Sequence, residues 1–176
     1  MIRTDITGMQ IRAYQDSDWS RLWPILRTVF REGESYPVSP DITQQKAMAY
    51  WTEPGKQSYV AVNAAEEMLG SYYIKPNQPS LGAHVCNCGY LVAEQARGQG
   101  VASRLCEHSQ QVAVEMGYRA MQYNLVVTTN EPAVRLWKKM GFQVVGVLPE
   151  AFNSKSRGYV DALVMYKQLV DDSLNT

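Results

Sequence analysis

Residues 95–105, QARGQGVASRL, place Gly98 and Gly100 on either side of a glutamine, directly before a helical pattern. A glycine-rich turn between a strand and a helix leaves backbone N–H groups free at the positive end of the helix dipole, where phosphate groups bind. Arg97 adds a guanidinium suited to phosphate, and Ala102 keeps the first helical turn small. The segment therefore predicts a pyrophosphate site, with an ordinary tight turn as the alternative.

The spacing of these glycines disfavours two common nucleotide-binding loops. The dinucleotide fingerprint G-x-G-x-x-G requires glycine where this chain has Ser103, and a P-loop continues with Gly-Lys-Ser or Gly-Lys-Thr, which this segment lacks. A pyrophosphate is therefore expected outside both of these nucleotide folds.

Outward from this loop, strand and helix patterns alternate along the chain. Apolar or alternating runs predict strands at residues 9–14, 58–63, 68–75, 84–93, 119–127, 142–148 and 160–166. Three- and four-residue apolar spacing predicts helices at residues 19–30, 43–51, 101–116 and 131–140, with Asp16 capping the first, Gly117 ending the third and Asn130 capping the fourth. This order predicts a mixed α/β (α+β) fold, with about four helices around one sheet.

The composition indicates one domain spanning residues 1–176, because 45% of the residues are hydrophobic and can form a full core. Lys plus Arg and Asp plus Glu both total 17, so no overall charge attracts nucleic acid or an anionic membrane. The first residues lack the apolar stretch of a signal peptide, and no apolar run is long enough to span a bilayer. We therefore expect a cytoplasmic protein whose partner is a small molecule or another protein.

Three cysteines, Cys86, Cys88 and Cys106, fit free thiols in a reducing cytosol, because an odd number cannot all pair within one chain. His84 alternates with Cys86 and Cys88 and raises the question of a metal site. Their spacing is not the C-x2-C of a zinc knuckle, and free cysteine commonly packs as a small hydrophobe. We therefore expect no metal.

Two segments resemble the GCN5-related N-acetyltransferases (GNAT). The stretch GYLVAEQARGQGVASRL resembles the acetyl-CoA-binding motif of that family, whose pattern Q/R-x-x-G-x-G/A falls on Arg97, Gly100 and Ala102. The stretch NEPAVRLWKKMGF, at residues 130–142, is similar to the family's N-x-x-A-x-x-L-Y-x-x-x-G-F element. Together the two motifs are far more specific than the glycine loop alone.

This resemblance implies a single-domain GNAT fold with acetyl-CoA as cosubstrate. Its central sheet is mostly antiparallel, and the fourth and fifth strands, here those with Tyr90 and Tyr123, splay apart where the cosubstrate lies. Leu91 and Val92 then offer main-chain groups to the pantetheine, and Asn130 contacts the same molecule. The pyrophosphate is held by the backbone of the loop residues Arg97, Gly98, Gln99, Gly100, Val101 and Ala102.

One position departs from the family pattern. The chain has Trp137 where the family commonly has a tyrosine that protonates the departing thiolate, and an indole cannot supply that proton. Either another group or water does so, or the step hardly matters because a thiolate is already a good leaving group. Trp137 is equally suited to packing its helix against the sheet.

Two asparagines, Asn87 and Asn124, interrupt otherwise apolar strands, where a buried carboxamide is costly unless it is hydrogen-bonded. They either bridge two strands or face the splayed region and hold a polar acceptor. The segments VCNCGYLV, YNLVVTTN, LWKKMGF and YVDALVMY resemble fungal L-azetidine-2-carboxylate N-acetyltransferases, which acetylate proline analogues. That resemblance implies that Asn87 binds the acceptor's carboxylate and that Asn124, 37 positions later, orients the amine or its proton-carrying water.

The acceptor itself is left open by the sequence. A primary amino acid, as in phosphinothricin-type acetyltransferases, uses the same cosubstrate site, and a module that senses acyl-CoA without turnover or an enzyme that acetylates proteins are further alternatives. Candidate bases by residue type are Glu94, His84, Glu150 and several tyrosines. In this family the loop between the first two helices, here FREGESYPVSPDIT, also shapes the acceptor pocket. Glu32 and Tyr36 are candidates there, and a solvated loop is the favoured alternative. Family resemblance also makes a homodimer plausible.

Overall fold

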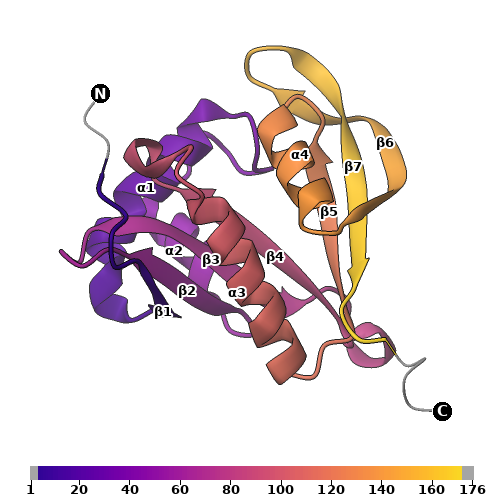
Figure 1. Cartoon of the computed structure of the whole chain (residues 1–176). Coiled ribbons are helices and arrows are strands. Elements are labelled where there is room, and N and C mark those ends of the chain that lie inside the picture. Colours follow the sequence, from indigo (N-terminus) through magenta and orange to yellow (C-terminus); the bar gives the residue numbers. More distant parts are fainter. Residues whose placement is uncertain (1–3, 172–176) are drawn as a thin grey trace.

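Seven strands form one mixed sheet in the computed structural model, which describes residues 4–171 (Figure 1). The strand order is β1-β2-β3-β4-β5-β7-β6, and all neighbouring strands are antiparallel except β4 and β5. In chain order the elements are β1 (Gln10–Ala13), α1 (Trp19–Glu32), α2 (Gln44–Thr52), β2 (Gln57–Val62), β3 (Met68–Pro76), β4 (Val85–Val92), α3 (Val101–Glu115), β5 (Ala120–Val127), α4 (Glu131–Lys139), β6 (Gln143–Ser154) and β7 (Gly158–Gln168).

The pairing between β4 and β5 is limited to one end of the two strands. Val85 lies opposite Ala120 and Cys86 opposite Met121, after which the strands separate. Figure 1 shows them meeting near the start of β5 and diverging toward α4. The predicted fold, a mostly antiparallel sheet splayed between its fourth and fifth strands and flanked by helices, is therefore confirmed.

Helices cover both faces of the sheet, which explains why β3 is buried along most of its length. Successive side chains of a strand point to opposite faces. Tyr72 and Ile74 accordingly pack in the core beneath α3, whereas Tyr73 packs in the core beneath α1 and α2. A strand with two covered faces is expected to be largely apolar, as residues 68–74 are apart from Ser71.

The order of elements was predicted correctly, but two details of the prediction were wrong. Strand β6 extends to Ser154, well beyond the predicted residue 148, because most of its side chains are exposed and leave no apolar alternation. Asp16 does not cap α1: it begins a short 3-10 turn, Asp16–Asp18, and the helix starts after Asp18. Among the described residues, no helix is long and apolar enough to cross a membrane.

Asp18 is buried and held by two arginines instead of capping the helix. Its carboxylate oxygens lie 2.8 Å from each of two Arg12 guanidinium nitrogens and 2.7 Å from Arg21 Nη2, and Oδ2 also accepts from the Gln15 amide at 2.9 Å. These contacts, above all the hydrogen bonds from Arg12, lower the pKa of Asp18 to about 2. The network ties β1 to the start of α1.

We expect Asp18→Asn to destabilise the protein by about 2 kcal/mol at neutral pH, which is the free energy that corresponds to this pKa shift. Because the pKa is lower in the folded state than in the unfolded chain, the stabilisation is present above about pH 4. It disappears as pH falls through the folded-state pKa of about 2. Urea unfolding of both proteins at several pH values, with the exposed Asp16→Asn as control, measures this difference. A difference that stays constant down to pH 2 contradicts the ion-pair explanation.

Candidate active site

The glycine loop between β4 and α3 adopts backbone conformations that only glycine adopts easily. Gly98 has φ 73° and Gly100 has φ 83°, both in the left-handed region. A Cβ atom at either position meets no heavy atom within 4 Å. Glycine is therefore required by the backbone angle, and the space beside the loop stays open for a ligand.

Backbone donors gather at this loop. The N–H groups of residues 98–100 have no acceptor in the part of the chain that the structure describes, and the first amides of α3 are free because they begin a helix. Open N–H groups at a helix N-terminus fit a pyrophosphate. The backbone geometry predicted from the sequence is thus present.

An outer groove of about 870 Å³ runs beside this loop, between the N-terminus of α3 and helix α4. It brings together the predicted cosubstrate residues Leu91, Val92, Arg97, Gly98, Gly100, Val101, Ala102 and Asn130. Gln99 is the exception, because it does not line the groove and its side chain turns back to donate to the carbonyl of Gln95 at 3.0 Å. Asn130 also caps α4 as predicted, with its side-chain oxygen accepting from the Ala133 amide.

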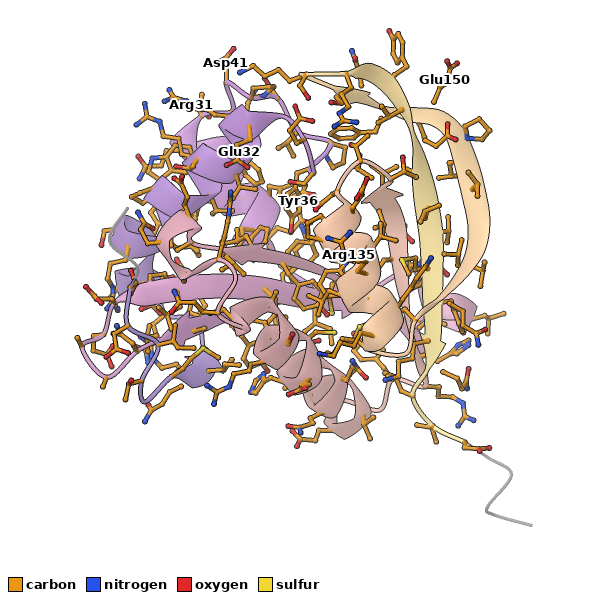
Figure 2. The ribbon with its side chains drawn as sticks, turned by 45° about the horizontal axis from the view of Figure 1, so that its top comes forward. Arg31, Glu32, Tyr36, Asp41, Arg135 and Glu150 are labelled. Atoms are coloured by element: carbon orange, nitrogen blue, oxygen red, sulfur yellow. The ribbon has the colours of Figure 1, made fainter. Side chains whose placement is uncertain are left out.

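Arg97 reaches across the edge of the groove to α1. Its Nη2 lies 3.1 Å from Glu32 Oε1, and both side chains are substantially exposed. An exposed ion pair contributes only about 0–1 kcal/mol, so an incoming anion can compete for the guanidinium. Glu32 therefore lies at the groove, in a segment that the sequence interpretation left in solvent (Figure 2).

An inner chamber of about 280 Å³ adjoins the outer groove where β4 and β5 separate. The chamber is bounded by Tyr50, Tyr73, Lys75, Asn87 and Asn124. It shares Tyr36, Tyr90, Asn130, Ala133 and Trp137 with the outer groove. The two cavities therefore meet at the split in the sheet.

Asn87 is buried and bridges the two strands just beyond their last paired residues. Its Nδ2 donates to the carbonyl of Gln122 at 2.9 Å, and its side chain also lines the inner chamber. This bridge is one of the two roles predicted from the sequence. A carboxamide nitrogen has two N–H groups, so the second remains for a ligand.

Asn124 is exposed, so the expectation that it is buried in an apolar strand was wrong. It lies where the β5–β7 register is irregular and beyond the split, where the β4-facing edge of β5 is no longer paired with β4. Its Oδ1 accepts from Gln122 Nε2 at 2.9 Å and its Nδ2 donates to Asn77 Oδ1 at 2.7 Å. The structure nevertheless places Asn87 and Asn124 in the lining of one chamber.

Tyr36 was assigned to a solvated loop, and this interpretation was wrong. Its ring packs edge-on against Phe30, Tyr50 and Trp51, at centroid distances of 5.4, 6.4 and 5.8 Å. Its hydroxyl donates to the carbonyl of Tyr90 at 2.5 Å, on the edge of β4 that β5 has left. Figure 2 shows Tyr36 between α1 and α4.

Burial raises the pKa of Tyr36 well above its ordinary value, so the phenol stays neutral and keeps the proton that it donates. Sequence reasoning named Tyr36 as a candidate in this loop but favoured solvent, because the partners of Tyr36 come from other elements. The one local signal was the apolar run Tyr-Pro-Val inside a polar loop.

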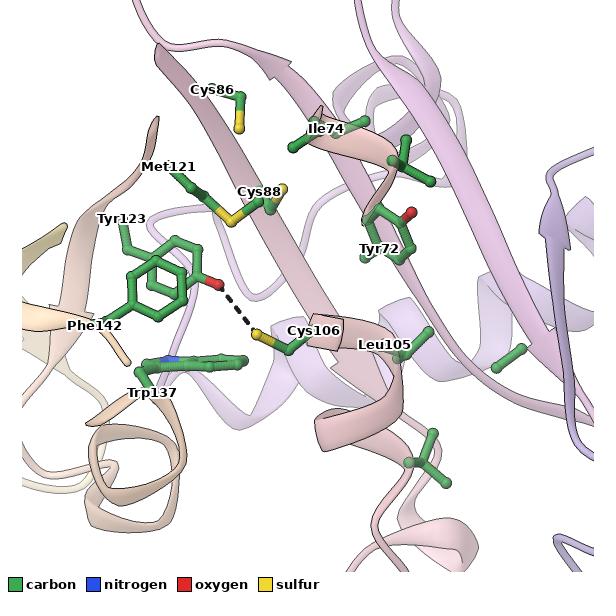
Figure 3. Packing of buried hydrophobic residues seen from close by; sticks show 14 of the residues in the cluster. Tyr72, Ile74, Cys86, Cys88, Leu105, Cys106, Met121, Tyr123, Trp137 and Phe142 are labelled. Carbon is green, nitrogen blue, oxygen red and sulfur yellow. Dashed lines mark hydrogen bonds between the residues drawn. The ribbon is translucent and has the colours of Figure 1, made fainter. Parts of the chain in front are cut away.

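Trp137 is packed, with only 8% of its surface exposed. Its ring lies 5.0 Å from the Tyr90 ring and 5.1 Å from the Tyr123 ring, and Figure 3 shows the indole beneath Tyr123. The Tyr123 hydroxyl interacts with Cys106 Sγ at 3.6 Å (Figure 3) and with the Tyr90 hydroxyl at 2.9 Å. This arrangement agrees with the predicted packing role of Trp137.

Three of the candidate bases suggested by residue type do not line either cavity. His84, Glu94 and Glu150 are all exposed, and Glu150 projects from the outer edge of the β6–β7 hairpin (Figure 2). Residue type alone selected them, and the fold directs them away from the split. Among the described candidate bases, it is tyrosines that line the chamber, including Tyr73, Tyr90 and Tyr123.

Comparison with known proteins gives consistent matches. Residues 19–142 match the family described as the acetyltransferase (GNAT) family. The chain is 30% identical over 148 residues to the N-acetyltransferase aca1 of Schizosaccharomyces pombe, a match that covers 75% of this chain and 71% of that protein.

Solved structures with the same architecture are also similar. A GCN5-related N-acetyltransferase from Kribbella flavida superposes with a TM-score of 0.86 at 40% identity, covering 92% of this chain and 98% of that one. A phosphinothricin acetyltransferase from Sinorhizobium meliloti, solved in complex with AcCoA, superposes with a TM-score of 0.82 at 16% identity, covering 97% of this chain and 92% of that one. The second likeness concerns the fold alone.

Proposed function

Because the chain belongs to the acetyltransferase (GNAT) family and is an acyltransferase, we propose that it transfers the acetyl group of acetyl-CoA to the nitrogen of a small amino or imino acid. The observation that carries this proposal is the meeting of the inner chamber with the outer groove at the split between β4 and β5. The groove suits a long phosphorylated cosubstrate, and the chamber suits a small acceptor.

Three features of the outer groove support acetyl-CoA as the cosubstrate. The open amides after Gly98 fit the pyrophosphate, and Leu91 and Val92 line the groove as a pantetheine contact requires. The Sinorhizobium meliloti protein of the same fold was solved with AcCoA, which is consistent with this use of the groove. Arg97 then exchanges its pairing with Glu32 for the phosphates.

Acetyl-CoA supplies an acetyl group activated as a thioester. The acceptor nitrogen must attack as a neutral amine: a nitrogen–carbon bond forms, the carbon–sulfur bond breaks, and one proton passes from the nitrogen to the sulfur through water. The Tyr90 carbonyl faces the split, where it accepts a hydrogen bond from the Tyr36 hydroxyl. In an extended strand, the N–H of a residue points to the same side as its carbonyl, so the Tyr90 N–H also faces the split. The Tyr90 N–H is therefore placed to stabilise charge on the thioester oxygen.

Asn87 and Asn124 are assigned to the acceptor. The free N–H of the Asn87 carboxamide donates to the acceptor's carboxylate, and Asn124 orients the amine or a proton-carrying water. An amide is not a base at neutral pH, so Asn124 acts by position. The lining of one chamber by both residues supports a proline analogue as acceptor, and a primary amino acid is the alternative that the phosphinothricin-type fold relatives support.

Release of CoA thiol from acetyl-CoA tests the proposal. The acceptor panel consists of L-azetidine-2-carboxylate, 4-hydroxyproline, primary amino acids and polyamines, with wild type and Asn124→Ala side by side. Turnover confined to cyclic imino acids supports a proline analogue as acceptor. Turnover with primary amino acids shows instead that the acceptor is a primary amino acid. If the protein binds CoA but releases no thiol with any acceptor, small-molecule acetylation is refuted, and an acyl-CoA sensor or a protein substrate is favoured.

The two asparagine variants are expected to affect different kinetic constants. Asn87→Ala removes a contact made to the bound acceptor and raises its KM roughly tenfold, as expected for one hydrogen bond to a charged group. Asn124→Ala removes an orienting contact and lowers kcat, by about 10- to 100-fold. Steady-state kinetics measure both, with the exposed Asn153→Ala as control. The opposite pattern means that the roles are exchanged.

A further inference from the structure

Lys75 is the one charged side chain among the described residues that line the inner chamber. It lies on β3 directly opposite Asn87 on β4, so that both side chains share one face of the sheet. The side chain is partly buried. None of the described aspartates and glutamates lines the chamber.

The charges around Lys75 leave its ammonium without a partner. Within residues 4–171, no carboxylate lies at ion-pair distance from it. The nearby Glu53 is outside the chamber lining and is already paired with Lys56, whose Nζ lies 2.9 Å from Glu53 Oε1. These three groups together carry one excess positive charge, and Lys75 is the group that presents it to the chamber.

A second ammonium, that of Lys56, packs against the chamber wall. Lys56 Nζ lies 4.5 Å from the ring centroids of both Tyr50 and Tyr73, and these rings form part of the chamber wall. Lys56 does not line the chamber, and because Glu53 pairs with it, the net positive charge beside the chamber remains the single charge that Lys75 presents. A cationic acceptor such as a polyamine is repelled, whereas an anion is attracted.

We propose that Lys75 binds the carboxylate of the acceptor together with Asn87, and so restricts the enzyme to acceptors that carry a carboxylate near the nitrogen. This inference rests on the proposed function and adds the residue that selects the charge of the substrate. An ammonium and a carboxamide N–H on adjacent strands supply two donors to one carboxylate. The amine end of the acceptor then points toward the split and Tyr90.

Paired ligands that differ only in charge test the role of Lys75. L-azetidine-2-carboxylate, L-proline and L-methionine are each compared with their carboxamides, by calorimetric titration into the CoA-saturated protein and by thiol release. Wild type is expected to prefer at least one acid over its amide. In Lys75→Met, affinity for that acid falls roughly 10- to 100-fold, as for the loss of a charge-assisted hydrogen bond, while affinity for the amide hardly changes.

Two further variants make the test selective. Lys46→Met removes an exposed lysine from α2 with the same change in net charge, and it keeps the preference for the acid. Lys75→Glu reverses the sign at the chamber and favours the amide over the acid. CoA affinity and thermal unfolding are measured for all variants to show that the groove and the fold are intact.

The outcomes separate this inference from the proposed function. In one outcome, wild type binds an acid more tightly than its amide, Lys75→Met abolishes this preference, and no thiol is released. This result supports Lys75 as a carboxylate ligand and refutes the acetyl transfer. In another outcome, acids cause thiol release, and both the rate of release and the affinity for the acid are the same in Lys75→Met as in wild type. This result supports the acetyltransferase activity and overturns the role of Lys75. Equal binding of acids and amides by wild type also overturns it.

Discussion

Gly100→Val is expected to weaken CoA binding at least 100-fold, as measured by calorimetric titration of CoA. Valine is strained at the φ of 83° that position 100 adopts, and left-handed backbone costs a residue with a Cβ atom roughly 1–2 kcal/mol or more. The branched side chain also enters the open space beside the loop, where the phosphates are proposed to lie. Both effects act on the amides that hold the anion.

Gly117→Val is the matched control for this variant. Gly117 has a φ of 85° and equally open surroundings, but it follows the opposite end of α3. The two substitutions therefore carry a similar backbone strain, and only the one at Gly100 alters the groove. Equal CoA affinities in Gly100→Val and Gly117→Val, with intact folds by circular dichroism, rule out the loop as the pyrophosphate site.

Trp51→Ala is expected to cost about 3–5 kcal/mol of folding free energy, the usual range for removing a buried aromatic side chain. Trp51 is completely buried on α2, and its ring lies 4.9 Å from the Tyr73 ring. Its Nε1 donates to Ser71 Oγ at 2.9 Å, and Ser71 is also completely buried. The change opens a cavity and removes a buried hydrogen bond.

The same variant should disturb the inner chamber more than the outer groove. Trp51 supports Tyr36 and Tyr73, which line the chamber, whereas the glycine loop lies on other elements. We therefore expect a raised KM for the acceptor and a nearly unchanged affinity for CoA. Urea unfolding and steady-state kinetics measure the two effects.

Two controls identify the cause of the Trp51 effect. Trp51→Phe keeps most of the packing and removes the hydrogen bond to Ser71, so its cost should be much smaller. Trp23→Ala removes a half-buried tryptophan that stacks on Trp19 and should also cost less. If Trp51→Ala is no worse than Trp23→Ala, the ring does not hold α2 on the sheet.

The parts of the site that the sequence predicted correctly depend on short-range interactions. The left-handed angles of Gly98 and Gly100 and the start of α3 are encoded within a few residues. The cap at Asn130 is equally local. Such features can be recognised from sequence because each residue's partner lies a few positions away.

The parts that were predicted wrongly depend on distant partners. Tyr36 was placed in solvent because its hydrogen-bond acceptor, Tyr90, lies 54 residues away. Asn124 was placed in a buried strand because nothing in its own segment shows that β4 leaves β5 after Cys86. The environment of each side chain is set by which elements pack around it.

The sequence by itself determined the order of elements, the glycine loop and its open amides, because backbone angles and apolar periodicity are properties of neighbouring residues. Family resemblance also predicted the split between β4 and β5. Only the tertiary structure decided that Tyr36 bonds to the edge of β4 that β5 has left, and that Lys75 and Asn87 line one chamber. The physical reason is that these contacts join segments far apart in the chain, and they exist only once the sheet has brought its strands into register.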